Sequence, residues 1–317
     1  MLCVIMKKGK RMIYTLTTNP AIDMNVCSDE LKKSQVNRTF GSVYTPNGKG
    51  LNVSFVLQHF GISSKIMGFF GGFSGNYIVK ESLKKGFGVV PVWVDNTTRI
   101  NIFLNDGVNE YKLVNEGAFV SQEKQEELLH KIDEAKDMNY LVISGSLPKG
   151  INTEYYDRIF RLCEDKKIQA ILDISSPKLA ELLKYQPLLI KPNDEELEDI
   201  FGMKVKTEDD MVNALKILHG KGAQNILLTL GDRGSYFYNG EHVYYANAQR
   251  IELLSSACAG DAALAAFLSV WLENTEKIEE AMKLSAATGA NVAESNAIGT
   301  LSKVEAYQKN IQVRKVE

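Results

Sequence analysis

The chain has 317 residues, of which 44% are hydrophobic and 24% are charged, a composition typical of globular enzymes and not of disordered chains. Its formal net charge of −2 gives no positive field that would recruit nucleic acid or an anionic membrane. The longest nearly apolar run, 262–272, is much shorter than the ~20 residues that span a bilayer. The cysteines and histidines are scattered along the chain and predict neither a disulfide framework nor a zinc site. We therefore expect a cytoplasmic protein without nucleic-acid or membrane partners, with residues 1–11 as an unstructured extension.

From Met12 onward, short apolar runs alternate with amphipathic helical stretches. The predicted strands are, in chain order, 12–17, 65–70, 140–145, 169–174, 187–192 and 225–231, and the clearest predicted helices are 121–136, 153–166, 193–202 and 207–219. The strands are apolar along their whole length, which is typical of parallel strands covered on both faces. The sequence therefore predicts an α/β fold with a doubly wound, mostly parallel sheet.

Two segments, 23–46 and 89–116, break this alternation with further β-rich runs and turn residues. We interpret them as a small β-lid on an α/β domain formed by 12–22, 47–88 and 117–317. Ligands of open α/β sheets bind beyond the carboxyl ends of the strands, so we expect the chemistry in the loops that leave strands.

The most distinctive segment is SSACAGDAALAAF at 255–267, where small residues lead into Asp261 and an apolar helix. Free amides and the helix dipole attract anions at such a helix start, so a phosphate could rest on the turn formed by Cys258, Ala259 and Gly260. Asp261 could then accept a proton from an attacking hydroxyl. Taken alone, the pattern favours the simpler interpretation that Asp261 only caps the helix.

A second segment, TPNGKGLN at 45–52, places glycines before a helix. Gly48 would let backbone amides approach a ligand, Lys49 adds a positive charge, and Asn52 offers a donor and an acceptor to sugar hydroxyls. The spacing is not that of a Walker A loop, and a simple glycine turn explains it equally well.

The third candidate segment follows a predicted strand and contains Lys191, Asn193 and Glu196. Asn193 and Glu196 are three residues apart at a helix start, so both could face one Mg²⁺ ion with its waters; a solvated acidic helix start is the alternative.

The remaining candidates are scattered. Thr229, Gly231 and Gly234 lie between two predicted strands and would also fit a plain hairpin. Asp23 and Ser144 follow or lie near strand ends, and Arg99 in the lid could bind a phosphate bidentately, although an isolated arginine is commonly a surface charge.

The order of these segments resembles one known family. TTNPAID, NGKGLN, GFFGGFSG, TTRIN, SGSLP, IKPNDEE, LTLGDRG and ACAGDA follow one another as the motifs of the ribokinase-like sugar kinases do, and specifically those of the phosphofructokinase-B branch. The resemblance runs from Met12 to the C-terminus and is greatest to 1-phosphofructokinases and tagatose-6-phosphate kinases. It implies a three-layer α/β domain with a β-lid, ATP and Mg²⁺ as cosubstrates, and a sugar phosphate held between lid and sheet.

The resemblance also implies roles for individual residues. Asp261 matches the catalytic base, and Cys258, Ala259 and Gly260 match the anion-hole turn. The positions that match sugar-binding residues are Asp23, Gly48, Lys49, Asn52 and Ser144, with Arg99 matching the arginine that binds the existing phosphate. Those that match nucleotide-binding residues are Lys191, Asn193, Glu196, Thr229, Gly231, Gly234, Ala287 and Asn291, with Asn193 and Glu196 also matching the magnesium segment.

Two positions depart from the family pattern, which usually has glycine at both. Asn47 should be tolerated because asparagine adopts left-handed backbone more readily than most residues. Cys258 places a side chain in the anion turn; a thiol at a helix start can have a lowered pKa, although we expect a buried and unreactive cysteine.

The implied activity is ATP-dependent phosphorylation of a ketohexose phosphate, with fructose 1-phosphate, giving fructose 1,6-bisphosphate, as the first expectation and tagatose 6-phosphate as the alternative. Asn47 and Cys258 keep open an alternative of another class, a regulator that binds a sugar phosphate or nucleotide without turnover. The exposed edges of the lid strands predict a homodimer formed through the lid.

Overall fold

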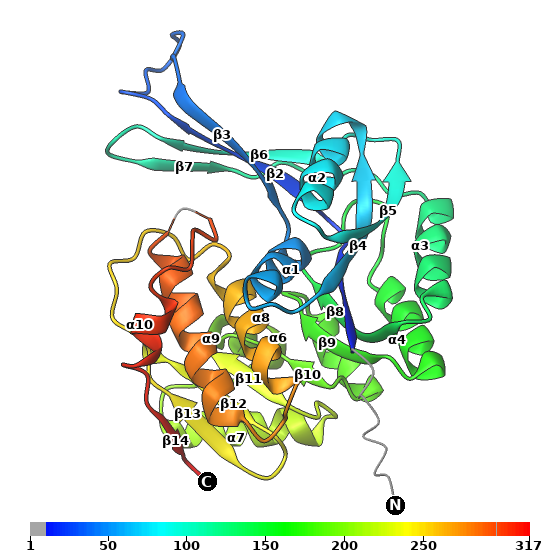
Figure 1. Cartoon of the computed structure of the whole chain (residues 1–317), viewed down its shortest axis with the longest axis vertical. Coiled ribbons are helices and arrows are strands. Elements are labelled where there is room, and N and C mark those ends of the chain that lie inside the picture. Colours follow the sequence, from blue (N-terminus) through cyan, green and yellow to red (C-terminus); the bar gives the residue numbers. More distant parts are fainter. Residues whose placement is uncertain (1–10, 296) are drawn as a thin grey trace, which may run out of the picture.

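The computed structural model describes residues 11–295 and 297–317 (Figure 1). In these residues the larger sheet has ten strands, in the spatial order β14 (Val313–Lys315), β13 (Val243–Ala246), β12 (Ser235–Tyr238), β11 (Ile226–Thr229), β10 (Leu189–Ile190), β9 (Gln169–Asp173), β8 (Met138–Ser144), β1 (Met12–Thr17), β4 (Ser64–Gly71) and β5 (Gly88–Val94). Neighbours from β11 to β5 are parallel, whereas β12, β13 and β14 pair antiparallel.

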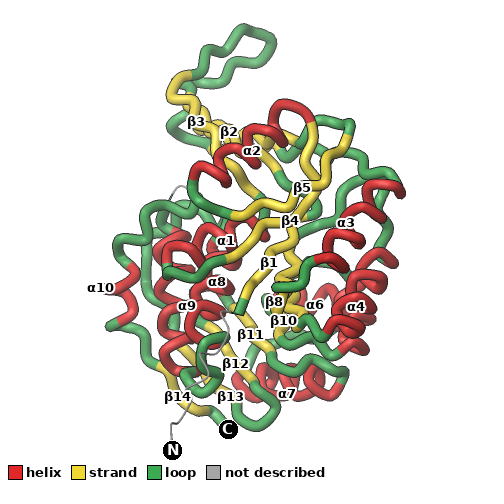
Figure 2. Tube along the Cα trace, turned by 45° about the vertical axis from the view of Figure 1, so that its right-hand side comes forward, coloured by secondary structure: helices red, strands yellow, loops and turns green. Residues whose placement is uncertain are grey.

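Helices cover both faces of this sheet, so the molecule has three layers (Figure 2). One face carries α1 (Lys49–His59), α2 (Gly72–Lys84), α8 (Ala259–Trp271) and α9 (Ile278–Ala293), with α10 (Val304–Gln308) beside α9. The other carries α3 (Gln122–Glu134), α4 (Glu154–Lys166), α5 (Lys178–Leu182), α6 (Asp194–Phe201) and α7 (Glu208–Gly220). The predicted three-layer α/β fold is confirmed.

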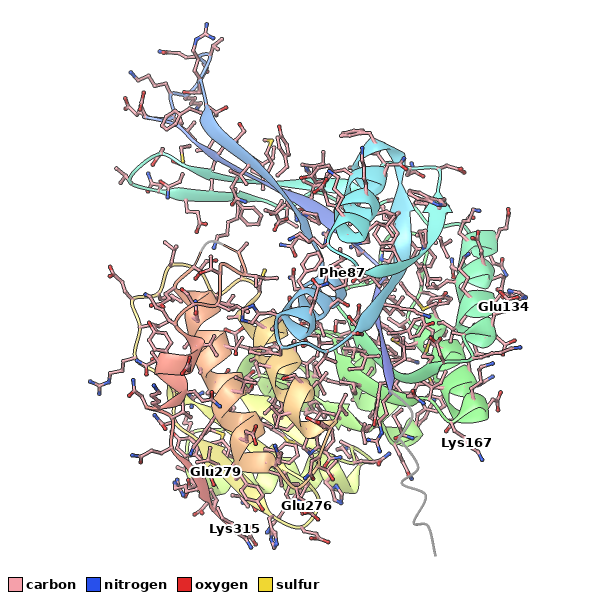
Figure 3. All side chains as sticks on the ribbon, in the orientation of Figure 1. Phe87, Glu134, Lys167, Glu276, Glu279 and Lys315 are labelled. Atoms are coloured by element: carbon pink, nitrogen blue, oxygen red, sulfur yellow. The ribbon has the colours of Figure 1, made fainter. Side chains whose placement is uncertain are left out.

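The strands are apolar throughout because both of their faces are buried. Along β8, Leu141 and Ile143 belong to the core cluster under α3 to α7, whereas Tyr140 and Val142 belong to the cluster under α1, α8 and α9. A third, smaller cluster joins α1, α2 and β4 and contains Phe87, which is labelled in Figure 3. Residues at the carboxyl ends of these strands are therefore held by a core on either side.

The predicted strands and helices correspond closely to observed ones, with one strand much shorter than expected. The prediction 187–192 yields only the two residues of β10. Pro187 and Pro192 flank it, and neither can donate a backbone hydrogen bond to a neighbouring strand.

A second sheet projects from the body and has four described strands, in the order β3 (Phe40–Asn47), β2 (Ala21–Cys27), β6 (Arg99–Asn105) and β7 (Glu110–Leu113) (Figure 1). We call this sheet the lid. Our assignment of all of 89–116 to the lid was wrong for its first part, because β5 pairs in parallel with β4 at the edge of the large sheet. The unit β4–α2–β5 extends the parallel sheet, and Pro91 is tolerated there because β5 is an edge strand.

Residues 1–10 of the expected extension lie outside the described residues, but Arg11 does not behave as part of an extension. Its guanidinium donates to the hydroxyl of Tyr140 and to the carbonyl of Leu272, both at 3.0 Å. In the described part of the chain, no helix has the length and apolar character needed to cross a membrane.

Candidate active site

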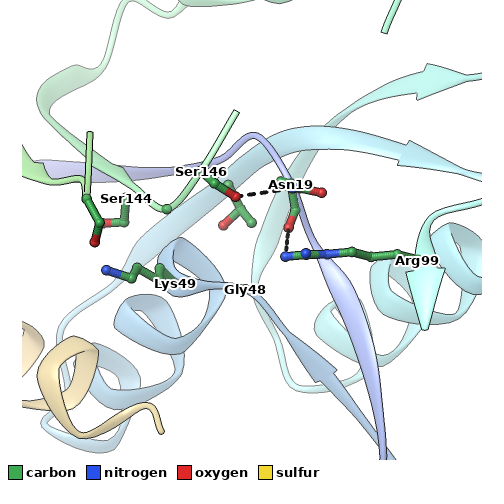
Figure 4. Close-up of a pocket in the computed structure, with 9 residues that line it drawn as sticks. Asn19, Gly48, Lys49, Arg99, Ser144 and Ser146 are labelled. Atoms are coloured by element: carbon green, nitrogen blue, oxygen red, sulfur yellow. Dashed lines mark hydrogen bonds between the residues drawn. The ribbon is translucent and has the colours of Figure 1, made fainter. Parts of the chain in front are cut away.

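A pocket of about 220 Å³ opens at the carboxyl ends of β1 and β8, under the base of the lid (Figure 4). The chain leaves β1 towards β4 on one side, and β8 lies on its other side, so this is a point where the strand order reverses and where α/β proteins bind ligands. The pocket is lined by Thr17, Asn19, Gly48, Lys49, Arg99, Ser144, Gly145, Ser146 and Ser175.

Three buried polar atoms of this lining have no hydrogen-bond partner among the described residues: Thr17 Oγ1, Ser144 Oγ and Arg99 Nε. An unpaired buried polar atom costs roughly 1–3 kcal/mol, so such atoms are rarely left together by chance. Their concentration in one pocket indicates that it binds a polar ligand.

Arg99, the first residue of β6, is fixed at the junction of lid and body. It donates to the carbonyls of Asn19 at 3.1 Å and Asn115 at 3.3 Å, and Asn19 in turn donates to Ser146 Oγ at 3.2 Å. Burial lowers the pKa of Arg99, and the Asp23 carboxylate opposes this effect. Arg99 and Lys49 lie at opposite ends of the pocket in Figure 4, so an anion could be bound at either end.

The glycines of the 45–52 segment have a steric role inside the protein. A Cβ on Gly48 would lie 2.5 Å from Thr17 Cγ2, and one on Gly50 would lie 2.9 Å from the carbonyl oxygen of Leu16. Side chains at these positions would therefore push the start of α1 away from β1. The close approach places Lys49 and Asn52, both on α1, against the strand ends.

A buried carboxylate that the sequence analysis did not single out, Asp173, lies at the end of β9. It is 1% exposed and pairs with Lys191 Nζ at 3.1 Å and Lys49 Nζ at 3.5 Å. Burial opposes its ionisation, but the two lysines outweigh burial and hold the pKa of Asp173 below its usual value. Its position as the last residue of a strand was the signal that could have identified it.

Asp261 lies in the first turn of α8 and is 5% exposed. Its Oδ2 accepts a hydrogen bond of 2.8 Å from Asn52 Nδ2 on α1, so the carboxylate binds another helix rather than capping its own. Burial, helped by the charge of Asp173, raises the pKa of Asp261 to about 7, while Lys49, Asn52 and Lys191 oppose the rise. This is the value expected of a general base working near neutral pH.

The turn before Asp261 approaches Lys191 closely. A Cβ on Gly260 would lie 3.3 Å from Lys191 Nζ, and Lys191 itself is 6% exposed. A lysine amine, the start of a helix and a buried carboxylate thus meet at one place, a combination that can bind a phosphate beside a proton acceptor.

Cys258 precedes α8 with a left-handed backbone, φ 63°, as a glycine there would have. Its Sγ lies 3.3 Å from Asn52 Nδ2 and 3.8 Å from Asn47 Nδ2. Burial raises the pKa of the Cys258 thiol to about 12, and the nearby Asp261 and Asp23 add to the rise. This direction is the opposite of the lowered pKa that a helix start can give a thiol.

Asn47, the other departure from the family pattern, does not need left-handed backbone, because it is the last residue of the extended strand β3. Its side chain donates to Asp23 Oδ2 and accepts from the amide of Gly48 and, at 3.0 Å, from Asn52 Nδ2. Asn101 Nδ2 donates to the other oxygen of Asp23 at 2.9 Å. Burial raises the pKa of Asp23 despite both hydrogen bonds.

Asn193 and Glu196 form a capping box at the start of α6. Asn193 Oδ1 accepts from the amide of Glu196 at 2.7 Å, and Glu196 Oε2 accepts from the amide of Asn193 at 3.1 Å. Ser175 donates to Glu196 Oε1, so each carboxylate oxygen has one partner and keeps a lone pair. These oxygens fit a hydrated Mg²⁺ ion, which favours oxygen ligands and keeps several waters.

The other expected nucleotide positions divide into two groups. Thr229 lies beside Asn193. Gly231 begins the 3-10 turn between β11 and β12 and Gly234 follows it, both with positive φ, and a Cβ on Gly234 would collide with the carbonyl of Ala246. Ala287 packs into the core from α9. The amide side chain of Asn291, also on α9, donates to Ser295 Oγ and accepts from the backbone amide of Lys303. The structure thus gives Ala287 and Asn291 packing and loop-anchoring contacts and does not bring them to the pocket.

The left-handed backbone of Cys258 predicts the order of stability of two variants. We expect Cys258→Gly to be more stable than Cys258→Ala by roughly 1 kcal/mol, since both remove the thiol and only alanine keeps a Cβ in the left-handed region. Urea unfolding would measure the difference. At Asn213, an exposed residue within α7, the same two substitutions should give the opposite order by about 1 kcal/mol, and the same order at both sites would contradict the strain argument.

The raised pKa of Asp261 predicts a pH-dependent stability. The folded protein holds the proton between about pH 4 and pH 7 while the unfolded chain releases it, so the stability contributed by the protonated acid is lost as pH rises through about 7. Asp261→Asn, which cannot ionise, should therefore be the more stable protein at pH 8, by about 1–4 kcal/mol.

Thermal unfolding of both proteins from pH 5 to pH 9 would check this. The advantage of Asp261→Asn should widen up to about pH 7 and then stay constant, whereas the exposed Asp29→Asn should give no such trend. An advantage that is independent of pH would mean that ionisation of Asp261 is not the cause.

Comparison with known proteins identifies the family of this chain. Residues 14–303 match the family described as pfkB family carbohydrate kinase. The chain is 50% identical over 302 residues to the D-tagatose-1-phosphate kinase of Klebsiella oxytoca, covering 95% of this chain and 99% of that protein. It is 31% identical to the 1-phosphofructokinase of Bacillus subtilis, covering 96% and 100%. The structure of Escherichia coli phosphofructokinase-2 in complex with fructose-6-phosphate superposes with a TM-score of 0.84 at 25% identity, covering 94% and 99%. The chain is therefore a member of the pfkB family of carbohydrate kinases.

Proposed function

We propose that the chain transfers a phosphoryl group from ATP to the C6 hydroxyl of a ketohexose 1-phosphate, with D-tagatose 1-phosphate as its substrate. The choice of sugar is supported by the 50% identity to a D-tagatose-1-phosphate kinase, against 31% for a 1-phosphofructokinase. Fructose 1-phosphate, which differs only in configuration at C4, is the second candidate, and tagatose 6-phosphate the third. The expected location in the cytoplasm remains a prediction.

The observation that carries the proposal is the pocket with Arg99 at one end and Lys49 at the other, lined by buried hydroxyls without partners. A sugar phosphate matches it, because the phosphate needs a cation and the sugar hydroxyls need donors and acceptors. In this arrangement Arg99 holds the existing phosphate, and Ser144, which lies beside Lys49 at the other end of the pocket, binds a sugar hydroxyl. Asp23 accepts hydrogen bonds from sugar hydroxyls at the lid.

Asp261 acts as the general base that takes the proton of the C6 hydroxyl. Lys191 and the amides from Cys258 to Gly260 stabilise the negative charge on the transferring group, and Lys49 holds the acceptor end in place. When bound, Mg·ATP supplies the phosphoryl group and the metal charge that neutralises its oxygens. Asn193 and Glu196 would hold that metal through water, with Thr229, Gly231 and Gly234 beside the phosphates.

The alternative of a non-catalytic regulator rested on Asn47 and Cys258. Cys258 adopts the left-handed backbone that a glycine would adopt, so the amides of the anion turn remain in place, and its thiol contacts the amides of Asn47 and Asn52. Both side chains are therefore accommodated without loss of a catalytic group, and this supports an active kinase.

We also propose that a second copy of the chain covers the lid. Phe40, Val43, Tyr44 and Leu113 are exposed apolar side chains on its strands, and β3 and β7 are its unpaired edges. Exposed edges and apolar side chains of this kind are commonly covered in an oligomer.

The activity can be tested by measuring ADP release with D-tagatose 1-phosphate, fructose 1-phosphate, tagatose 6-phosphate, fructose 6-phosphate and free fructose. We expect the highest kcat/KM with D-tagatose 1-phosphate. Asp261→Asn should lower kcat by at least ~10² while still binding Mg·ATP, because only proton transfer is lost. Nucleotide binding without ADP release from any sugar would favour the regulator, and near wild-type turnover by Asp261→Asn would remove the base from its role.

Arg99 can be tested separately through substrate selectivity. We expect Arg99→Ala to raise KM for the sugar phosphate by roughly 10–100-fold, consistent with the loss of a charged hydrogen bond, and to leave the weak rate with free sugar nearly unchanged. Arg158→Ala is a suitable control, since Arg158 is exposed on α4 and pairs with Glu126 on α3, away from the pocket. Equal losses with phosphorylated and free sugars would contradict a phosphate-binding role for Arg99.

A further inference from the structure

We propose that Asn47 is a positioning residue: it orients the side-chain amide of Asn52 so that this amide donates to Asp261, and it thereby links the lid to the base. The inference rests on the proposed function, in which Asp261 accepts the proton. It concerns a residue that departs from the usual glycine of the family and that belongs to the lid rather than to the helix of the base.

A continuous path of hydrogen bonds runs from the lid to the base. Asp23 on β2 accepts from Asn47 Nδ2 at the end of β3, and Asn47 Oδ1 accepts from Asn52 Nδ2 at 3.0 Å. Asn52 Nδ2 then donates to Asp261 Oδ2 at 2.8 Å. All four side chains are buried or half-buried, so water does not readily replace these contacts.

The direction of this path is set by the groups that contact Asn47. The ionised Asp23 carboxylate can only accept, and the backbone amide of Gly48, which contacts Asn47 Oδ1, can only donate. If the Asn47 amide were turned over, its NH₂ group would face the Gly48 amide and its oxygen would face Asp23. Asn47 therefore has one favourable orientation, with its oxygen towards Asn52.

That oxygen determines the orientation of Asn52. The NH₂ group of Asn52 has two hydrogens, and its nitrogen lies within hydrogen-bonding distance of both Asn47 Oδ1 and Asp261 Oδ2. If Asn52 were turned over, its oxygen would face two acceptors, a repulsive arrangement unless Asp261 carried a proton. With Asn47 in place, Asn52 favours the ionised, proton-accepting form of Asp261.

The place of Asn47 in the chain connects this effect to the lid. Asn47 pairs with Ala21 in the lid sheet, and it is joined to α1 through Gly48, whose carbonyl accepts from the Asn52 backbone amide at 2.9 Å. A change in lid position relative to the body therefore moves Asn47 with respect to Asn52. In the arrangement of lid and body described here, Asn47 and Asn52 therefore favour the acceptor form of the base.

Other charged groups also act on Asp261, and an experiment must separate them from Asn52. Lys49 comes from α1, Asp173 from the end of β9 and Lys191 from the segment after β10, while the neutral thiol of Cys258 precedes α8. Asn47 and Asn52 are uncharged, so substitutions there change a hydrogen bond without changing the net charge around the base.

The test is the pH dependence of kcat for Asn47→Ala, with Asn101→Ala as the matched control. Each substitution removes one hydrogen bond to Asp23, but only Asn47 contacts Asn52. We expect both to raise KM for the sugar phosphate. The acid limb of the profile is the fall of kcat at low pH, where the base becomes protonated. Only Asn47→Ala should move this limb to higher pH, by about one unit. Its kcat would then be roughly tenfold lower than that of the unchanged protein at low pH and would recover at high pH.

A double-mutant cycle tests whether Asn47 acts through Asn52. Asn52→Ala should shift the acid limb at least as far as Asn47→Ala, and the double variant should shift it no further than Asn52→Ala alone, because Asn47 acts through Asn52. Thermal unfolding and Mg·ATP binding would establish that each variant is folded.

The outcomes separate the two proposals. If Asp261→Asn turns over normally, the proposed function has lost its base. If Asp261→Asn is inactive, the base remains and the role of Asn47 is judged separately. That role is wrong if Asn47→Ala leaves the acid limb in place or moves it no further than Asn101→Ala does. It is also wrong if the shifts of Asn47→Ala and Asn52→Ala add in the double variant.

Discussion

Two carboxylates are buried near one another at the carboxyl edge of the sheet, and the remaining features of the site follow from how their charge is balanced. Asp173 has two lysine partners and stays ionised, and its charge raises the pKa of Asp261, whose hydrogen-bond donor is the amide of Asn52. The two acids therefore differ in proton affinity, although both are almost fully buried. Because their pKa values differ, Asp173 can hold the two lysines in place while Asp261 exchanges a proton near neutral pH.

The two lysines of the site can pair with Asp173 or with a bound phosphate. Lys191 and Lys49 both contact Asp173, and Lys191 also lies against the turn that begins α8. A bound phosphate would compete with Asp173 for these amines. The carboxylate keeps both lysines ordered at the strand ends, and ordering the groups beforehand reduces the conformational entropy lost on binding an anion.

The lid is connected to this site through the start of α1 and through Arg99. Gly48 and Gly50 allow α1 to begin directly against β1, so the strand that leaves the lid and the helix that carries Lys49 and Asn52 are separated by a single residue. Arg99 is held at the junction of lid and body by the carbonyls of Asn19, which follows β1, and Asn115, which follows β7. The lid residues of the pocket thus have defined positions relative to the sheet.

The sequence by itself determined the layers, because fully apolar strands separated by amphipathic helices can bury both kinds of surface only in a doubly wound sheet. It also identified Asp261, Lys49 and Arg99 as candidates, since residue type and position beside a strand or helix end are local properties. It did not identify Asp173, and it placed β5 in the lid, because pairing partners are not encoded in any one segment. Contacts such as Asn52 with Asp261, which are 209 residues apart, arise only when α1 and α8 pack on the same face of the sheet. The tertiary structure alone decided which carboxylate holds lysines and which is left to bind a proton, because burial and neighbouring charges set that difference.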